Sequence, residues 1–331
     1  MTRFVSILVA SLLLIMSFGA SALAKTPRVV LVVERLGDRS FADSAWAGMQ
    51  RAQKELRGKV IAKVVEAPEL TAAEEQMAAF AKDGWDLIIT LGFGYVDTFK
   101  KLAPKYPNSK FLIIDAEIPG IPNVKSVLFR EHEGSFLVGA LAGLMTKTNN
   151  VGFIGGMDIP LIHRFQGGFE QGVKYVNPKA KIQSYYVGAW NDAAKGKELT
   201  SVEISRGADI IYAAAGGSGA GMIQAAQEKG KYGIGVDSDQ CYLAPKNMIG
   251  SMVKRVDNAV FYTIFDLVNG KFKATTENLG IKEEGVGWCG LPPVSDKVAL
   301  QHVPKDVVEK LAQIQKDIVS GKIKVEDWMT R

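Results

Sequence analysis

Short apolar runs and longer amphipathic segments alternate along the chain in a regular order. In the first part of the chain the apolar runs cover residues 29–33, 60–65, 86–90, 111–114 and 124–129, which is typical of buried parallel strands. Amphipathic segments lie between these runs; for instance, one helix face carries Phe41, Ala45, Met49 and Ala52. The pattern predicts alternating strands and helices, and therefore parallel sheets with right-handed crossovers.

One helix in the middle of the chain differs from the others because it is apolar on nearly every side. It covers about residues 131–147, and a helix that is apolar all round is buried. A membrane span needs about 20 apolar residues, and this run is bounded by Glu133 and Lys147, so we reject that alternative. Gly139 and Gly143 lie four residues apart, and one stripe of the helix can therefore approach another backbone closely.

The same order of elements begins again after this helix. Strands are predicted at 151–154, 181–187, 210–214, 234–236 and 248–252, and helices near 162–175, 193–205, 221–229, 256–268 and 305–319. The repetition predicts an α/β protein with two doubly wound parallel-sheet lobes and one cleft. Ligands of open α/β sheets bind outside the carboxyl ends of the strands, so these ends are where site residues are expected.

The first 24 residues have the pattern of a secretory signal peptide. Arg3 supplies a positive charge, residues 4–16 are mainly apolar, and Ala22-Leu23-Ala24 is a small-x-small cleavage site, which leaves Lys25 as the mature N-terminus. The alternative is an uncleaved membrane anchor. No Cys lies near the cleavage point, so a lipid anchor is not expected. We therefore expect a periplasmic protein that is not anchored to the membrane.

Charge and cysteine content narrow the class of protein further. The formal net charge of +5 falls to +4 when Arg3 leaves with the signal peptide, and bases and acids are interspersed, which indicates neither nucleic acid nor a membrane surface as a partner. Cys241 and Cys289 are the two cysteines of the chain. In an exported protein they are expected to form a disulfide, the alternative being two unrelated buried thiols.

Motifs for catalysis, cofactors or metals do not emerge from the sequence. The run of glycines 216–221 follows a strand, but a dinucleotide fingerprint would require glycine at Met222. His132, His163 and His302 are dispersed and make no metal-ligand spacing with the cysteines. We expect no metal and no cofactor, and the sequence offers no positive indication of an enzyme.

Aromatic and acidic residues stand at or near several predicted strand ends: Phe41, Asp115, Trp190, Tyr212 and Asp237. Facing rings can sandwich a flat heterocycle, at about 1–3 kcal/mol per stacked base, and a carboxylate can accept two hydroxyl hydrogen bonds from a sugar diol. For each aromatic residue, packing in the core is the alternative. For each carboxylate, capping of a helix is the alternative.

Several long motifs resemble a known family. They are FREHEGSFLVGALAGLMTKT, VGFIGGMDIPLIHRFQGGFEQG, GAWNDAAKGKEL, AAGGSGAG, GVDSDQ, SMVKRVDNAV and the ending GVGWCGLPPVSD…VPKDVVEKLAQIQKDIVSGKIKV. Together they resemble the basic membrane protein family, which comprises exported substrate-binding proteins of ABC importers, of the purine nucleoside receptor type. The resemblance covers essentially the whole chain after residue 24, and it is more specific for the family than for the ligand.

The resemblance implies the type I periplasmic binding protein fold, in which two lobes are joined by a three-strand hinge and close on a ligand. On this basis the first lobe would comprise residues 25–147 and about 253–285. The second lobe would comprise residues 148–252 and about 286–331. The protein is expected to act as a monomer, with a small-molecule ligand and an ABC transporter permease as its partners.

The resemblance also implies a set of ligand-binding residues. In nucleoside-binding members an aromatic ring from each lobe stacks on the base, and here Phe41 matches the first ring and Tyr212 is the best match for the second. Asp115 matches an acid that reads the edge of the base, and Asp237 matches the acid that holds the ribose hydroxyls. Further matches are a lysine near the ribose, a backbone contact and a stacking aromatic of sugar-binding relatives: Lys254, Gly217 and Trp190.

Two positions depart from the family pattern. The loop that usually carries an Asp or Asn reaching the base here begins with Glu34 and looks shortened, and Ala42 replaces the usual Asn. Both departures affect base recognition, so the expected ligand is a purine nucleoside or a related nucleobase. Two other functions stay open: a nucleoside-cleaving enzyme that uses the same cleft, and a ligand sensor that docks a membrane receptor.

Overall fold

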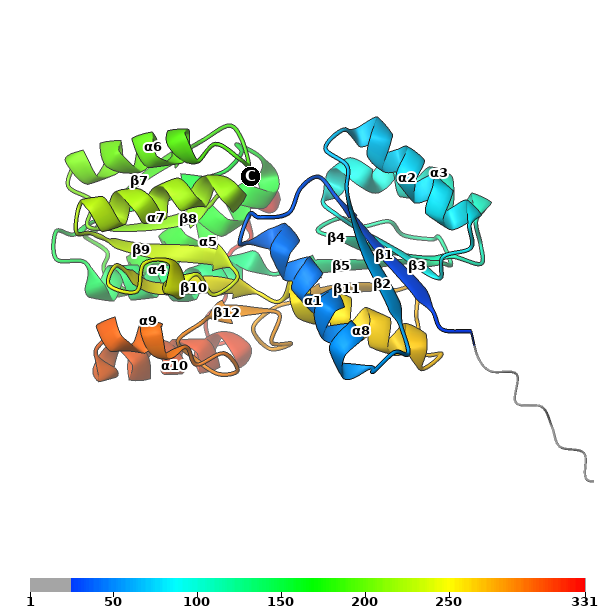
Figure 1. Cartoon of the computed structure of the whole chain (residues 1–331). Coiled ribbons are helices and arrows are strands. Elements are labelled where there is room, and N and C mark those ends of the chain that lie inside the picture. The colour runs from blue at the N-terminus through cyan, green and yellow to red at the C-terminus, as the bar shows by residue number, and fades with distance from the viewer. Residues whose placement is uncertain (1–24, 331) are drawn as a thin grey trace, which may run out of the picture.

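The computed structural model describes residues 25–330, and the predicted signal peptide lies outside the described residues. Figure 1 shows two α/β lobes side by side, each built on one sheet. We call the lobe that contains β1 to β5 lobe 1 and the lobe that contains β6 to β10 lobe 2. The predicted architecture of two doubly wound, mainly parallel sheets is confirmed.

Lobe 1 has a six-stranded sheet in the order β11-β5-β4-β3-β1-β2, and its paired strands are parallel. The strands are β1 (Arg28–Val33), β2 (Ile61–Glu66), β3 (Leu87–Leu91), β4 (Lys110–Ile114), β5 (Val124–Phe129) and β11 (Thr276–Leu279). The helices are α1 (Phe41–Glu55), α2 (Leu70–Lys82), α3 (Val96–Lys105) and α8 (Val256–Val268), with a 3-10 turn η1 (Phe93–Tyr95). Successive residues of β1 point to opposite faces, so Leu31 packs on the α1 side and Val32 on the α2 and α3 side.

Lobe 2 repeats this plan with the strand order β12-β10-β9-β8-β6-β7. The strands are β6 (Asn150–Gly155), β7 (Lys181–Tyr186), β8 (Ile210–Ala214), β9 (Tyr232–Asp237), β10 (Met248–Lys254) and β12 (Val286–Trp288). The helices are α4 (Glu131–Met145), α5 (Pro160–Val176), α6 (Ala193–Ser205), α7 (Gly219–Glu228), α9 (Lys297–His302) and α10 (Lys305–Val319), with 3-10 turns η2 (Gly216–Ser218), η3 (Cys241–Leu243) and η4 (Trp328–Thr330). The edge strand β12 runs antiparallel to β10.

The chain passes between the lobes three times, after β5, after β10 and between β11 and β12. The second and third crossings lie near the expected residues 253 and 285. The first lies at residue 130 and not at 147, because α4 packs against α5, β10 and β12 of lobe 2. The central helix therefore belongs to lobe 2, and the expected boundary of lobe 1 is corrected accordingly.

Glycines allow α4 and α5 to pack with their backbones in contact. A Cβ at Gly139 would lie 2.1 Å from the carbonyl oxygen of Phe169, and a Cβ at Gly172 would lie 2.0 Å from the carbonyl oxygen of Phe136. The expected close approach along the glycine stripe is thus confirmed, with Gly143 facing Val173. Within residues 25–330 no helix is both long and apolar enough to cross a membrane.

The elements that the periodicity did not predict are short and lie late in the chain. β11 and β12 have four and three residues, and α9 has six. Their local patterns are too brief to show a period. They complete the edges of the two sheets and the outer layer of lobe 2.

Candidate functional site

A cavity of about 420 Å³ lies between the two lobes. Lobe 1 contributes residues that follow β1, β3 and β4, together with the first turn of α1. Lobe 2 contributes residues of α5 and residues that follow β7, β8 and β9, and Lys254 comes from the end of β10. The carboxyl ends of both sheets thus face one space, which is the expected place for a ligand in open α/β sheets.

Seven of the eight ligand-binding residues expected from the sequence line this cavity: Glu34, Phe41, Asp115, Trp190, Gly217, Asp237 and Lys254. They come from segments far apart in the sequence, and the structure brings them together. Whether each contacts a ligand stays a prediction. Trp190 is 36% exposed at the margin of the cavity, and its ring lies so close to Gly156 that a Cβ there would be 2.4 Å away.

Tyr212 does not line the cavity, so the structure does not support the expected stacking role. Its side chain is fully buried in lobe 2, where its ring centroid lies 5.6 Å from that of Phe153 and 5.3 Å from that of Phe169. Its hydroxyl lies 3.3 Å from Ser135 Oγ. Tyr212 stands in the middle of β8, two residues before Ala214 at the strand end, and so it points into the helix layer.

Besides Trp190 at its margin, lobe 2 presents the ring of Phe165 on α5 to the cavity. Phe41 and Phe165 come from the same place in their lobes, the first helix after the first-numbered strand. The Lys254 ammonium lies 4.9 Å from the centroid of Phe41, 5.5 Å from that of Phe165 and 5.1 Å from that of Phe129. An ammonium near aromatic faces is stabilised by cation–π attraction, so these rings help to hold Lys254 in place.

The loop before α1 is fixed by its own acidic residues. The Asp38 carboxylate accepts hydrogen bonds from the backbone N–H groups of Ser40 and Ala42, both at 2.9 Å. The Asp43 carboxylate accepts from the N–H groups of Gly37 and Arg39, both at 2.8 Å. These bonds satisfy N–H groups of the loop and of the first turn of α1, and they fix the position from which Phe41 reaches the cavity.

Two aspartates at the ends of central strands supply buried acceptors beside Lys254. Burial raises the pKa of Asp115 to about 6, although the Lys254 ammonium acts in the opposite direction. Burial also raises the pKa of Asp237 to about 7, against the opposing effects of Lys254 and the Ser40 hydroxyl. Asp115 Oδ2 accepts a hydrogen bond from Lys254 Nζ at 2.5 Å. Asp115 Oδ1 is buried and accepts no hydrogen bond from the described residues.

The two lobes also contact each other directly at one side of the cavity. The Ser40 hydroxyl of lobe 1 donates a hydrogen bond to Asp237 Oδ2 of lobe 2. Next to it, Gln240 Nε2 donates to the carbonyl oxygen of Arg39 at 2.9 Å, and Val236 N donates to the Gln240 side chain at 3.1 Å. The end of β9 and the loop after it therefore carry both a cavity carboxylate and the contacts with the opposite lobe.

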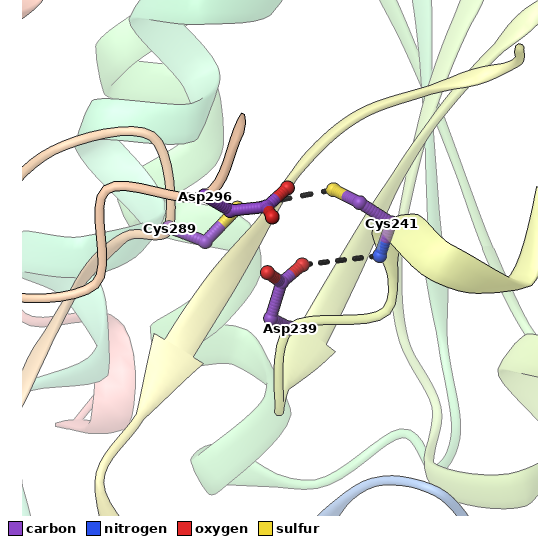
Figure 2. A group of neighbouring side chains, drawn as sticks. All are labelled: Asp239, Cys241, Cys289 and Asp296. Carbon is purple, nitrogen blue, oxygen red and sulfur yellow. Dashed lines mark hydrogen bonds between the residues drawn. The ribbon is translucent and has the colours of Figure 1, made fainter. Parts of the chain in front are cut away.

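The two cysteines lie close together next to this loop, as Figure 2 shows. Their sulfur atoms lie 3.9 Å apart as free, buried thiols, so the expected disulfide stays a prediction. Asp239 and Asp296 add a carboxylate oxygen each, and the four donor atoms lie within 4.8 Å of one another, close enough to hold a metal ion. Sequence spacing gave no sign of this cluster, because its members come from two segments that meet only in the folded protein.

Fold and cavity together define a two-lobed α/β protein with a cavity of ligand size between its lobes. The family model described as ABC transporter substrate-binding protein, PnrA-like, matches residues 25–327. The chain belongs to this family, and the resemblance to the basic membrane protein family is confirmed.

Individual relatives agree with this assignment. The chain is 32% identical over 337 residues to the ABC transporter nucleoside-binding protein BmpA of Lactococcus lactis subsp. cremoris, with 93% of this chain and 91% of the relative covered. It is 34% identical over 296 residues to basic membrane protein A of Borreliella burgdorferi, with 86% of each covered. The crystal structure of a solute-binding protein of an ABC transporter system from Aeropyrum pernix is similar, with a TM-score of 0.81, 29% identity and coverage of 91% and 93%.

Proposed function

We propose that the protein binds a purine nucleoside, or a related nucleobase, between its lobes and delivers it to an ABC permease. The observation that carries the proposal is the set of groups in the cavity: an aromatic ring from each lobe and two buried carboxylates beside one ammonium. A nucleoside matches this set, because it has a flat ring with polar edges and a sugar with neighbouring hydroxyl groups.

Each part of such a ligand has a counterpart in the cavity. Phe41 and Phe165 would stack on the base, at about 1–3 kcal/mol for each ring. Asp115 Oδ1 lacks a hydrogen-bond partner among the described residues and would accept an N–H of the base. Asp237 would accept the ribose hydroxyls, with Lys254 beside it and Gly217 as a backbone contact. Glu34 and Trp190 stand at the margins and would complete the enclosure.

The charges in the cavity favour a neutral ligand over a nucleotide. Four acids, Glu34, Asp38, Asp115 and Asp237, line the cavity, against two bases, Arg35 and Lys254. Excess acid repels a phosphate group and attracts donors of hydrogen bonds. We therefore expect nucleosides to bind more tightly than the corresponding monophosphates.

Delivery would follow from closure of the lobes about the three crossing segments, with the closed form recognised by the permease. The chain would act in the periplasm after removal of residues 1–24. The relative from Lactococcus lactis is named as a nucleoside-binding protein of an ABC transporter, which supports the same assignment for this chain.

The first experiment is mass spectrometry of the small molecules released when the purified protein is denatured. We expect a purine nucleoside or nucleobase, and calorimetry with inosine, guanosine and adenosine should rank the candidates. Incubation of inosine with the protein should release no hypoxanthine, whereas release would favour the enzyme. Failure of all nucleosides and nucleobases to bind would overturn the proposal.

A further inference from the structure

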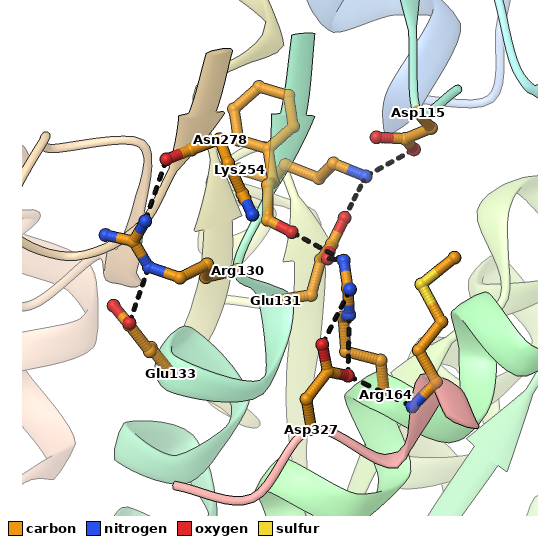
Figure 3. A network of polar contacts seen from close by, with 10 residues as sticks. Asp115, Arg130, Glu131, Glu133, Arg164, Lys254, Asn278 and Asp327 are labelled. Atoms are coloured by element: carbon orange, nitrogen blue, oxygen red, sulfur yellow. Dashed lines mark hydrogen bonds and ion pairs between the residues drawn. The ribbon is translucent and has the colours of Figure 1, made fainter. Parts of the chain in front are cut away.

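A series of alternating charges leads from the cavity to the C-terminal end of the protein (Figure 3). The Lys254 ammonium lies 2.5 Å from Asp115 Oδ2 and 2.8 Å from Glu131 Oε1. Glu131 Oε2 lies 3.1 Å from Arg164 Nη1. The Arg164 guanidinium also donates two hydrogen bonds to the carboxylate of Asp327, at 2.9 and 2.7 Å. Five side chains from five separate segments therefore form one continuous charge series.

The middle of the charge series is removed from solvent. The side chains of Glu131 and Lys254 are 0% and 1% exposed, and that of Arg164 is 10% exposed. Removing one partner of a buried ion pair leaves an uncompensated charge, which is strongly unfavourable. Each of these ions is therefore compensated by the neighbours on its two sides.

We infer that Glu131, Arg164 and Asp327 are positioning residues of the binding site, and that through them the C-terminal segment forms part of that site. The inference rests on the proposed function in that it takes Asp115 and Lys254 as ligand-binding groups. The three residues are absent from the cavity lining, so they act on the ligand only through the orientation and charge of these two groups.

The C-terminal segment reaches the charge series by crossing α5 of lobe 2. Glu326 N donates to Gln171 Oε1 at 2.8 Å, and Gln171 Nε2 donates to the Glu326 carbonyl oxygen at 3.0 Å. The Trp328 ring lies so close to Gly167 that a Cβ there would be 2.3 Å from it. These contacts flank Asp327 on both sides and fix its carboxylate against Arg164.

Arg164 also ties this arrangement to the first crossing between the lobes. Its Nη1 donates to the carbonyl oxygen of Phe129 at 2.8 Å, and Phe129 is the last residue of β5 in lobe 1. Glu131 begins α4 directly after this crossing, and Lys254 ends β10 directly before the second. The charge series therefore lies where the chain passes between the lobes.

Glu131 and Arg164 act on Asp115 with opposite signs, which gives the inference a specific test. The negative charge of Glu131 raises the pKa of Asp115, and the positive charge of Arg164 lowers it. The other charged and titratable groups of the cavity lining, from β10, β9, the loop after β1 and η1, stay the same in both variants: Lys254, Asp237, Glu34, Arg35, Asp38 and Tyr95. Loss of structure alone would not move one titration in two directions.

The experiment follows the Asp115 carboxyl by ¹³C NMR in the ligand-free protein, with Asp115→Asn to assign the signal. Glu131→Gln should move the midpoint of the titration to lower pH and Arg164→Gln should move it to higher pH, each by about one pH unit. In parallel, Asp327→Ala should weaken nucleoside binding at pH 8 by about tenfold, and Asp327→Glu should restore most of it. Glu309→Gln removes an exposed ion pair of α10 and serves as the control.

Shifts in opposite directions together with the Asp327→Ala loss support the inference. Shifts of the same sign, or none, overturn it, and so does an Asp327→Ala variant that binds as tightly as the Glu309→Gln control. If Arg164→Gln does not fold, Glu131→Gln and Asp327→Ala decide the question. If the wild type binds no nucleoside but the two variants shift the Asp115 titration in opposite directions, the proposed function is wrong and the electrostatic coupling within the charge series is still supported. Normal nucleoside binding by the wild type, with no shift of the Asp115 titration in either variant, would support the proposed function and overturn the inference on the charge series.

Discussion

Asp115 and Asp237 occupy equivalent positions in the two lobes. Asp115 follows β4 and Asp237 ends β9, and these strands hold the same place in their sheets, counted from the edge strands β11 and β12. Both residues have a left-handed backbone, with φ of 61° and 62°. Residues other than glycine rarely adopt this conformation, and those that do are concentrated at functional sites. The cavity is therefore built from two copies of one arrangement that meet at Lys254.

Binding should depend on the ring that α1 supplies. Phe41→Ala removes one stacking surface and should weaken nucleoside binding by about 1–3 kcal/mol, as measured by calorimetry. Tyr212→Phe is the matched control, because it removes only a hydroxyl group that contacts Ser135 in the core. We expect the control to bind like the wild type. Equal affinities in Phe41→Ala and the wild type would exclude Phe41 from the site.

Asp237 should distinguish nucleosides from free bases. A hydrogen bond to a charged group contributes about 1.5–3 kcal/mol, so Asp237→Ala should weaken inosine binding far more than hypoxanthine binding. Calorimetry with both ligands measures the difference. An equal loss for the two ligands would assign Asp237 a structural role, most simply through its bond with the Ser40 hydroxyl.

Ligand affinity should fall as the solution becomes more acidic. Burial raises the pKa of Asp115 to about 6, so the carboxylate is ionised at pH 8 and takes up a proton as the pH falls through 6. Inosine is mainly uncharged in this range, and the single N–H group of its base, at N1, prefers an ionised acceptor. Below the pKa one linked proton weakens binding by up to about tenfold per pH unit.

Calorimetry between pH 5 and 8 tests this expectation. Asp115→Asn should bind more weakly at pH 8 and lose part of the pH dependence. Asp237, whose pKa is raised to about 7 by burial, would account for the remaining part. A constant affinity over this range, or tighter binding in acid, would contradict the assignment of Asp115 as an ionised acceptor.

Cys241 and Cys289 should be bonded to each other in the exported protein. The neighbouring Cys289 thiol, together with burial and Asp239, raises the pKa of Cys241, so the reactive thiolate is disfavoured once the site is folded. The bond would therefore form during folding. In the chain-entropy model a loop of this length contributes up to about 4 kcal/mol, and reduction should lower the melting temperature with little change in affinity.

Titration of thiols in denatured, unreduced protein decides between the possible states of this cluster. No reactive thiol indicates the disulfide. Two thiols per protein without bound metal would exclude the disulfide. Two thiols together with one zinc ion released per protein would show that the four donor residues hold a metal ion. Cys241→Ser combined with Cys289→Ser should bind nucleoside normally in either case, since the pair lies outside the cavity lining.

Most of the fold could be predicted from the periodicity of apolar residues and from the order of the predicted strands and helices. Apolar runs such as residues 29–33 are long enough to mark strands, and their regular alternation with helices restricts the topology to parallel sheets. The boundary of lobe 1 was misplaced because the helix 131–145 is apolar on all sides, so its pattern does not show which sheet it covers. Its packing against α5, β10 and β12 in the folded protein decides this.

The site could be predicted where it depends on strand ends and not where it depends on side-chain direction. That Asp115 and Asp237 line the cavity could be expected, because parallel strands bring their carboxyl ends to one edge. Tyr212 lies two residues before the end of its strand, β8, and the sequence does not show that its ring faces the helix layer. Phe165 sits in a long family motif, yet an apolar residue early in a helix looks the same whether it faces core or cavity. The series from Asp115 to Asp327 joins distant segments, and no local pattern reveals it.

Lobe 1 is completed by segments from late in the chain, the edge strand β11 and the helix α8. β11 pairs with β5, and α8 covers α1 so closely that a Cβ at Gly48 would touch the backbone of Asp257. Both segments follow β6 to β10 in sequence. A polypeptide that emerges N-terminus first therefore cannot complete its first lobe until most of the second has been synthesised. Contacts of such long sequence separation slow folding, and a late-folding first lobe would suit the export that residues 1–24 predict.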